Sequence, residues 1–164
     1  MEERARNLLI FQTSGMDCAL PVESVREIVP MAMLSAPPGL PSGMAGFLNL
    51  RGVAIPIVHL DRLFNLPEQR PGLNTPMIVL RGVLGPVGIL VHYVRSIVDV
   101  SPEQLLDIPH DRTFGGCAVA TVQLDGDMVQ LLSPAALLQA NEERMLADYC
   151  VMEQARLSHM EAKN

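Results

Sequence analysis

The sequence predicts a mainly β protein in which two small barrels share one core, with short helices and a C-terminal helix. Three observations lead to this prediction. Short apolar segments alternate with Gly/Pro turns along most of the 164 residues, and 49% of the residues are hydrophobic. Two segments, "VAIPIVHL" (53–60) and "VGILVHYV" (87–94), each place a histidine after an apolar run. From about residue 140 onward, Gly and Pro disappear and good helix formers dominate.

The first thirty residues predict a hairpin followed by a short helix. "NLLIFQT" (7–13) and "DCAL" (17–20) are strand-like and flank a Ser-Gly turn. In "PVESVREIVP" (21–30), apolar residues recur at helical spacing, and a proline stands at each end. We therefore expect a helix of about two turns over 21–30.

The next segment predicts a loop, two strands and a helical turn. Residues 35–43 are rich in Pro and Gly. Strands are expected over 44–50 and 53–60, joined near Arg51-Gly52. Since proline cannot donate to a ladder, Pro56 should lie at an edge or a bulge.

The second half is again rich in strands, over 76–82, 85–94 and 95–100. "SPEQ" (101–104) has the pattern of a capping box. The run 117–132 predicts a hairpin with Asp125-Gly126 as its turn, and Ser133-Pro134 opens a helix. We expect a domain over 5–140 and a helical extension over 141–164, either packed on the domain or offered to a partner.

Charge and composition exclude several classes of function. The net charge is −6, aromatic residues make up 4%, and the single lysine is Lys163, so nucleic acid is not an expected partner. The start "MEERARNLL" lacks the pattern of a signal peptide, and no apolar run has the roughly 18–20 residues of a membrane span. We expect a cytoplasmic protein without direct membrane contact.

The sequence offers no catalytic motif, and we expect neither enzymatic activity nor a cofactor. Cys18, Cys117 and Cys150 form no CxxC pair and predict free thiols. The candidate acid–base pairs are His59 with Asp61, His92 with Asp99, and His110 with Asp111, but no third ligand or nucleophile accompanies them. An alternative remains open: a β-barrel that binds a metal or small ligand through His59 and His92.

Arg51 stands out because it interrupts the apolar run "GFLNLRGVAIPIVHL" (46–60). Such a side chain either pairs with an acid inside the fold or faces a partner. Glu23 and Glu27 are candidate partners within the chain. An arginine with an apolar surround is also typical of a binding hot spot, and the two interpretations are compatible.

The run 46–60 resembles the "G-V-x-N-L-R-G-x-x-x-P-V-x-D-L" signature of the CheW-like domain, the coupling proteins of bacterial chemotaxis arrays. "LIFQTSGMDCALPVESVREIV" is similar to the opening segment of that family, and "VGILVHYV" to its "V-G-I-L-V-D-x-V" strand. "SPEQL" (101–105) falls where the family often has a similar capped turn. "GDMVQLLSPAALL" resembles the closing strand and helix. The resemblance spans roughly residues 7–140.

The resemblance implies two SH3-like five-stranded sub-barrels around a shared core, and a non-catalytic adaptor. Such an adaptor couples the helical tip of a chemoreceptor to the regulatory domain of a CheA-type histidine kinase, and it can join rings with other CheW-like domains. It would lie in the cytoplasm, in receptor arrays at the inner membrane. The receptor tip would occupy a groove between the sub-barrels, lined by Val25, Glu27, Ile28, Gly46, Asn49, Arg51 and Val94.

The chain departs from the family pattern at two positions. His59 and His92 stand where the family usually has aspartate. If folding disfavours the charged imidazole, aspartate should be tolerated at both positions at neutral pH and should reduce any loss of stability on acidification.

Overall fold

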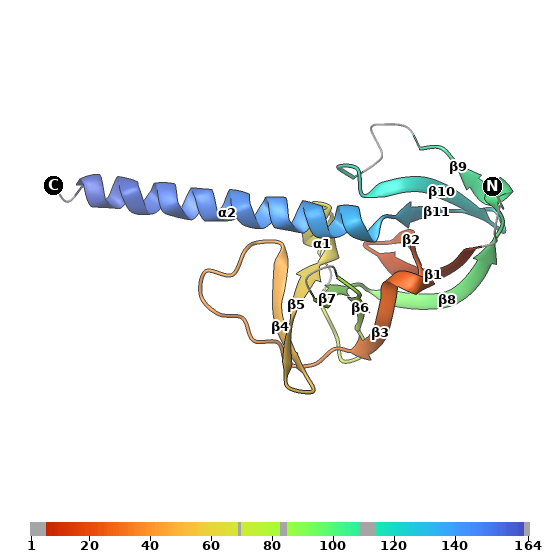
Figure 1. Cartoon of the computed structure of the whole chain (residues 1–164), viewed down its shortest axis with the longest axis horizontal. Coiled ribbons are helices and arrows are strands. Elements are labelled where there is room, and N and C mark those ends of the chain that lie inside the picture. Colours follow the sequence, from red (N-terminus) through yellow and green to blue (C-terminus); the bar gives the residue numbers. More distant parts are fainter. Residues whose placement is uncertain (1–5, 69, 83–84, 109–113, 163–164) are drawn as a thin grey trace.

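The computed structural model describes residues 6–68, 70–82, 85–108 and 114–162. Two mixed β-sheets lie side by side, and a long C-terminal helix starts beside the first, runs past the second and extends beyond it (Figure 1). Its elements, in chain order, are β1 (Arg6–Thr13), β2 (Met16–Pro21), η1 (Val22–Ser24), β3 (Val25–Pro30), β4 (Met44–Leu50), β5 (Val53–His59), α1 (Leu60–Leu63), β6 (Pro76–Leu80), β7 (Val87–Leu90), β8 (Tyr93–Val100), η2 (Pro102–Gln104), β9 (Leu105–Leu106), β10 (Ala118–Leu124), β11 (Asp127–Leu132) and α2 (Pro134–Ala162).

The two sheets are interleaved along the chain. The first has the strand order β8-β1-β2-β11-β10-β9, and the second has the order β3-β6-β7-β5-β4. The first barrel is therefore built from both ends of the chain and the second from its middle. Five strands were expected in each barrel; the first has six because the two-residue β9 pairs with β10.

Buried residues form three clusters, and one of them joins the sheets. Leu8 and Ile10 lie inside the barrel that the first sheet forms, whereas the neighbouring Leu9 and Phe11 face the opposite way. Because successive side chains of a strand point to opposite faces, β1 is buried on both. Leu9 and Phe11 join residues of the second sheet, such as Val58, in the largest cluster. The predicted shared core is therefore confirmed.

Residues 21–30 form a strand, so the predicted helix is wrong. A single 3-10 turn, η1, is followed by β3, which pairs antiparallel with β6. Burial along β3 alternates with a period of two residues. The apolar residues at helical spacing are Val and Ile, whose branched Cβ favours strands. The partner strand lies about fifty residues later in the chain, so the pairing of β3 with β6 cannot be read from the local sequence.

The similarity of the two histidine-containing segments suggested that they belong to two equivalent halves, but the structure does not place them so. β5 and β7 are parallel neighbours within the second sheet, with Val58 opposite Ile89 and His59 opposite Leu90. Pro56 lies in β5 opposite Phe47 of β4, one residue before the pairing with β7 begins. Its missing N–H is thus tolerated at a local edge, as expected.

Several turns confirm the sequence prediction. β1 and β2 form the expected hairpin, and Leu60–Leu63 form the expected helical turn. Ser101 and Gln104 form both halves of the capping box at η2. Asp125 and Gly126 have φ angles of 45° and 85°, as a tight hairpin turn requires.

The C-terminal helix packs on the barrels near its start and is exposed near its end. Leu137 and Asn141 are buried. Arg144 donates hydrogen bonds to the backbone oxygen of Arg62 at 2.6 Å and to Ser42 Oγ at 3.1 Å. Farther along, Val151, Met152, Leu157 and Met160 are exposed. Among the described residues, no helix combines the length and apolar character that crossing a membrane requires.

Candidate functional site

The "NLRG" segment forms the tight turn between β4 and β5. Arg51 and Gly52 both have positive φ angles, 51° and 86°. The side-chain oxygen of Asn49 accepts a hydrogen bond from the Gly52 backbone N–H at 3.0 Å. The Asn49 side chain therefore supports the turn, and the turn presents Arg51 to the surface.

Arg51 is held by an acid of the edge strand β3. Its Nη2 lies 2.5 Å from Glu27 Oε1, and its side chain is 66% exposed. Of the two acids considered from the sequence, Glu27 is the partner, while Glu23 is exposed in η1. Arg51 is thus both paired within the fold and accessible to a partner.

Gly46 has a structural role at the start of β4. Its φ is 146°, and a Cβ at this position would lie 2.8 Å from the Ser35 backbone oxygen. Ser35 exchanges two backbone hydrogen bonds with Phe47, at 2.9 and 2.8 Å. Glycine is therefore needed for the 34–35 segment to cross β4, a role that the sequence motif alone did not reveal.

The remaining candidate residues come from both sheets. Val25 and Ile28 lie on β3 of the second sheet, and Val94 lies on β8 of the first. Val25 and Val94 both pack, half-buried, against the shared core cluster. Ile28 is 42% exposed and follows Glu27 in β3, where burial alternates, so the two side chains point to opposite faces of the strand. The structure thus joins Glu27 with Arg51, and Val25 with Val94 through a common cluster, while Gly46 and Asn49 shape the backbone.

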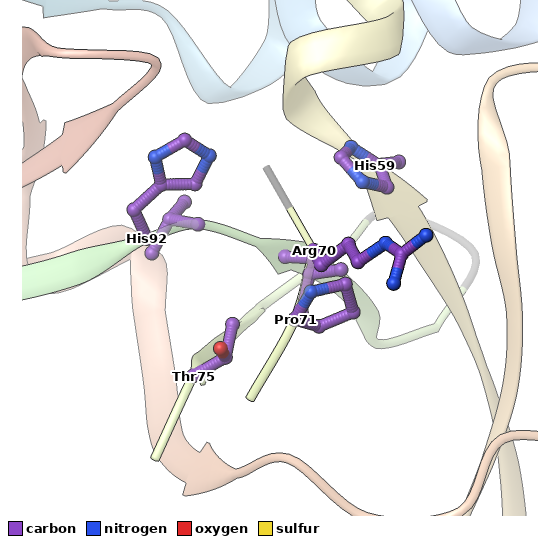
Figure 2. A pocket seen from close by; sticks show the side chains of 7 residues that line it. His59, Arg70, Pro71, Thr75 and His92 are labelled. Carbon is purple, nitrogen blue, oxygen red and sulfur yellow. The ribbon is translucent and has the colours of Figure 1, made fainter. Parts of the chain in front are cut away.

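His59 and His92 line one small recess of about 50 Å³. Figure 2 shows the His92 ring on one side and the His59 ring with the Arg70 side chain on the other. Thr75 and Pro71 lie on the wall between them. The structure thus brings together the two histidines of the alternative ligand site considered from the sequence.

The sequence suggested Asp99 as the acidic partner of His92, but the structure pairs His92 with Asp61. His92 Nε2 lies 2.6 Å from Asp61 Oδ2, and His92 Nδ1 accepts a hydrogen bond from the Ser14 backbone N–H at 3.1 Å. The expectation that aspartate would be tolerated at position 92 did not take account of this contact with Asp61. Aspartate at position 92 would set two carboxylates against each other.

These bonds argue against a metal site formed by His59 and His92. Both ring nitrogens of His92 are engaged, so neither is available as a metal ligand. Within the described ranges, no three histidine, cysteine or acidic side chains gather as a metal ion would require. The pair His110 and Asp111 lies outside the described residues.

His59 is buried at the first turn of α1, and its pKa is lowered. Burial is the largest cause, and the nearby Arg62 guanidinium acts in the same direction. His59 Nε2 lies 3.7 Å from Glu68 Oε1, and Nδ1 is buried without a hydrogen-bond partner. Glu68 is itself bound by Arg62, which lowers the pKa of the Glu68 carboxyl.

The three cysteines are free thiols, as predicted. Cys18 and Cys117 are buried, and Cys150 is exposed. Burial raises the pKa of Cys18 to about 12 and also raises the pKa of Cys117. Because the thiolate is the nucleophilic form, both buried thiols are unreactive.

The two interleaved sheets and the exposed Arg51 turn define a β-barrel protein of the scaffold or adaptor class. The chain belongs to the CheW-like domain family, whose pattern it matches over residues 7–142. It is thus a scaffold or adaptor of bacterial chemotaxis systems.

Curated relatives match across most of the chain. The probable chemotaxis protein CheW of Rhizobium etli is 29% identical over 142 residues, which cover 84% of this chain and 90% of the relative. Protein FrzA of Myxococcus xanthus is 28% identical and covers 84% of this chain and 88% of its own length.

A solved structure shows the same fold. The scaffolding protein TtCheW of Thermoanaerobacter tengcongensis superposes with a TM-score of 0.74 at 18% identity. The superposition covers 79% of this chain and 90% of that one. The two interleaved sheets of this chain are therefore also the fold of that scaffolding protein.

Proposed function

We propose that this protein couples the helical tip of a chemoreceptor to the regulatory domain of a CheA-type histidine kinase. The observation that carries the proposal is the exposed Arg51 guanidinium, fixed by Glu27 and by a tight turn. A preorganised cation held at an edge strand that also exposes the apolar Ile28 suits an amphipathic helix whose polar face carries an acid or carbonyl oxygens.

The receptor tip would lie between the two barrels. Val25 and Val94 would supply apolar contacts from opposite sheets, with Glu27, Ile28 and Arg51 beside them. Asn49 and Gly46 would act indirectly, by holding the turn and the path of β4. The proposal is supported by the common packing of Val25 and Val94 against the shared cluster.

The kinase domain would bind a different face, because an adaptor must hold both partners at once. Additional CheW-like domains would complete a ring in the cytoplasm, at receptor arrays of the inner membrane. Residues 5–140 would form the binding domain, and 141–164 an extension of it.

Calorimetry with purified partners tests this proposal. A receptor-tip hairpin and a kinase regulatory domain are titrated into the protein separately, and then each into the complex with the other. We expect both to bind, with each affinity little changed by the other partner. Absence of binding by either partner, or mutual exclusion, would contradict the proposal.

A further inference from the structure

A buried carboxylate connects the two barrels. Asp61 is fully buried and lies in α1, directly after β5 of the second sheet. Its Oδ1 accepts a hydrogen bond from Thr13 Oγ1 at 2.5 Å, and its Oδ2 lies 2.6 Å from His92 Nε2. Burying a carboxylate is costly unless it is hydrogen-bonded, and both of its oxygens are.

The partners of Asp61 come from the first sheet and from the connection between the sheets. Thr13 is the last residue of β1. His92 lies between β7 of the second sheet and β8 of the first. Its backbone N–H donates to the Gln12 oxygen at 2.9 Å, and its Nδ1 accepts from the Ser14 N–H. His92 is therefore fixed on one side to the β1–β2 turn and on the other to α1.

These bonds determine the proton position on His92. Since Nδ1 accepts a hydrogen bond, the ring proton lies on Nε2 and points at Asp61. Leucine at position 92 would remove both ring contacts, whereas glutamine could still donate to Asp61.

The network lies close to the wall of the proposed groove. Val94 follows His92 by two residues, about 7 Å along a strand. It packs against the cluster that Val25 also contacts. Displacing His92 would move Val94, in the first barrel, relative to β3 of the second.

We propose that Thr13, Asp61 and His92 form a clasp that fixes the relative position of the two barrels and thereby positions Val94 for receptor binding. The clasp residues are positioning residues and need not contact the partner. The role in receptor binding rests on the function proposed above, whereas the role in barrel position does not.

The test uses two readouts on the full chain. Spin labels at Ala54→Cys in β5 and Gln123→Cys in β10, in a Cys150→Ser background, report the distance between the barrels. Calorimetry reports the affinity for a receptor-tip hairpin. We expect His92→Leu to broaden or shift the distance distribution and to weaken tip binding about tenfold. His92→Gln should restore most of both.

Thr13→Val is the second test variant, to be used if His92→Leu does not fold. It removes the hydrogen bond from Thr13 to Asp61 with little change of side-chain shape. The matched control is Thr121→Val, a buried threonine whose hydroxyl contacts Gln130 within the first sheet alone. Thr13→Val should shift the distance distribution and weaken tip binding, and Thr121→Val should do neither.

An unchanged distance distribution in the folded clasp variants would overturn the clasp. A shifted distribution with unchanged tip affinity would overturn its role in receptor binding. If the wild-type protein fails to bind the tip, the proposed function fails, and the distance measurement alone decides whether the clasp exists.

Discussion

The Arg51 guanidinium contacts the Glu27 carboxylate at 2.5 Å and so connects the β4–β5 turn to the edge strand β3. The pair is formed between residues 24 positions apart, and the Arg51 side chain remains 66% exposed. Exposed ion pairs contribute little to folding, typically about 0–1 kcal/mol. We therefore attribute the importance of Arg51 to binding rather than to stability.

Arg51→Glu should weaken binding of the receptor tip by about 2 kcal/mol or more, roughly thirtyfold, because it reverses a fixed charge in the proposed groove. The fold should persist, since the ion pair is exposed. Calorimetry with a tip hairpin and a thermal melt measure the two effects.

Arg156→Glu is the matched control for this variant. Arg156 also forms an exposed pair, with Glu153 at 2.8 Å, but on α2 and outside the proposed groove. It should leave tip affinity unchanged. Equal affinities of wild type and Arg51→Glu, with normal melting of both, would remove Arg51 from the site.

Gly46→Ala should destabilise the fold by about 2–4 kcal/mol, as strain at a positive φ adds to a contact with the Ser35 oxygen. Gly52→Ala is the control. Gly52 has a φ of 86°, and a Cβ there would meet no atom within 4 Å, so only about 1–2 kcal/mol is expected. Urea unfolding compares the two, and an equal cost would show that the contact with Ser35 is not decisive.

The lowered pKa of His59 predicts a loss of stability in mild acid. The unfolded chain binds a proton near the ordinary value of 6.5, whereas the folded protein resists it. The unfolded state thus takes up more protons, and the free energy of unfolding falls as pH drops through and below that value. Asp61 and Glu68 oppose this shift, while Arg62 and His92 favour it.

His59→Gln should reduce this pH dependence, because glutamine does not titrate. Melting temperatures between pH 7.5 and 5.5 provide the measurement, with His92 present in both proteins as a common background. A wild type that gains stability on acidification relative to His59→Gln would show that the pKa is raised and would refute the assignment.

A thiol reagent should modify one cysteine rapidly in the folded protein and all three after unfolding. Cys150 is exposed, whereas burial raises the pKa of the other two thiols. Cys150→Ser should abolish the rapid phase. Two rapid equivalents per folded chain would contradict the burial of Cys18 or Cys117.

Local signals in the sequence predicted much of the fold. The Asp125-Gly126 turn, the capping box at Ser101 and the break at Arg51-Gly52 each depend on a few neighbouring residues, and the structure confirms them. The strand over 25–30 was missed because its identity depends on β6, far along the chain. Propensity could have signalled it, since three of its six residues are Val or Ile.

Only part of the candidate site could be predicted from the sequence. The pairing of Arg51 with Glu27 was among the alternatives considered, but the roles of Asn49 and Gly46 in the backbone became clear only from geometry. The contact between His92 and Asp61 joins residues 31 positions apart, one in α1 and the other in the connection between β7 and β8. In the sequence, the one local sign of this contact is an acid that closely follows an apolar segment.

Kinase autophosphorylation tests the central claim most directly. A CheA-type kinase is assayed with membranes that contain its receptor, with and without this protein and with Arg51→Glu. The account predicts that the protein alone turns over no ATP, that it changes the phosphorylation rate only when receptor and kinase are both present, and that Arg51→Glu largely loses this effect. The same rate with and without the protein, or ATP turnover by the protein alone, would contradict the account.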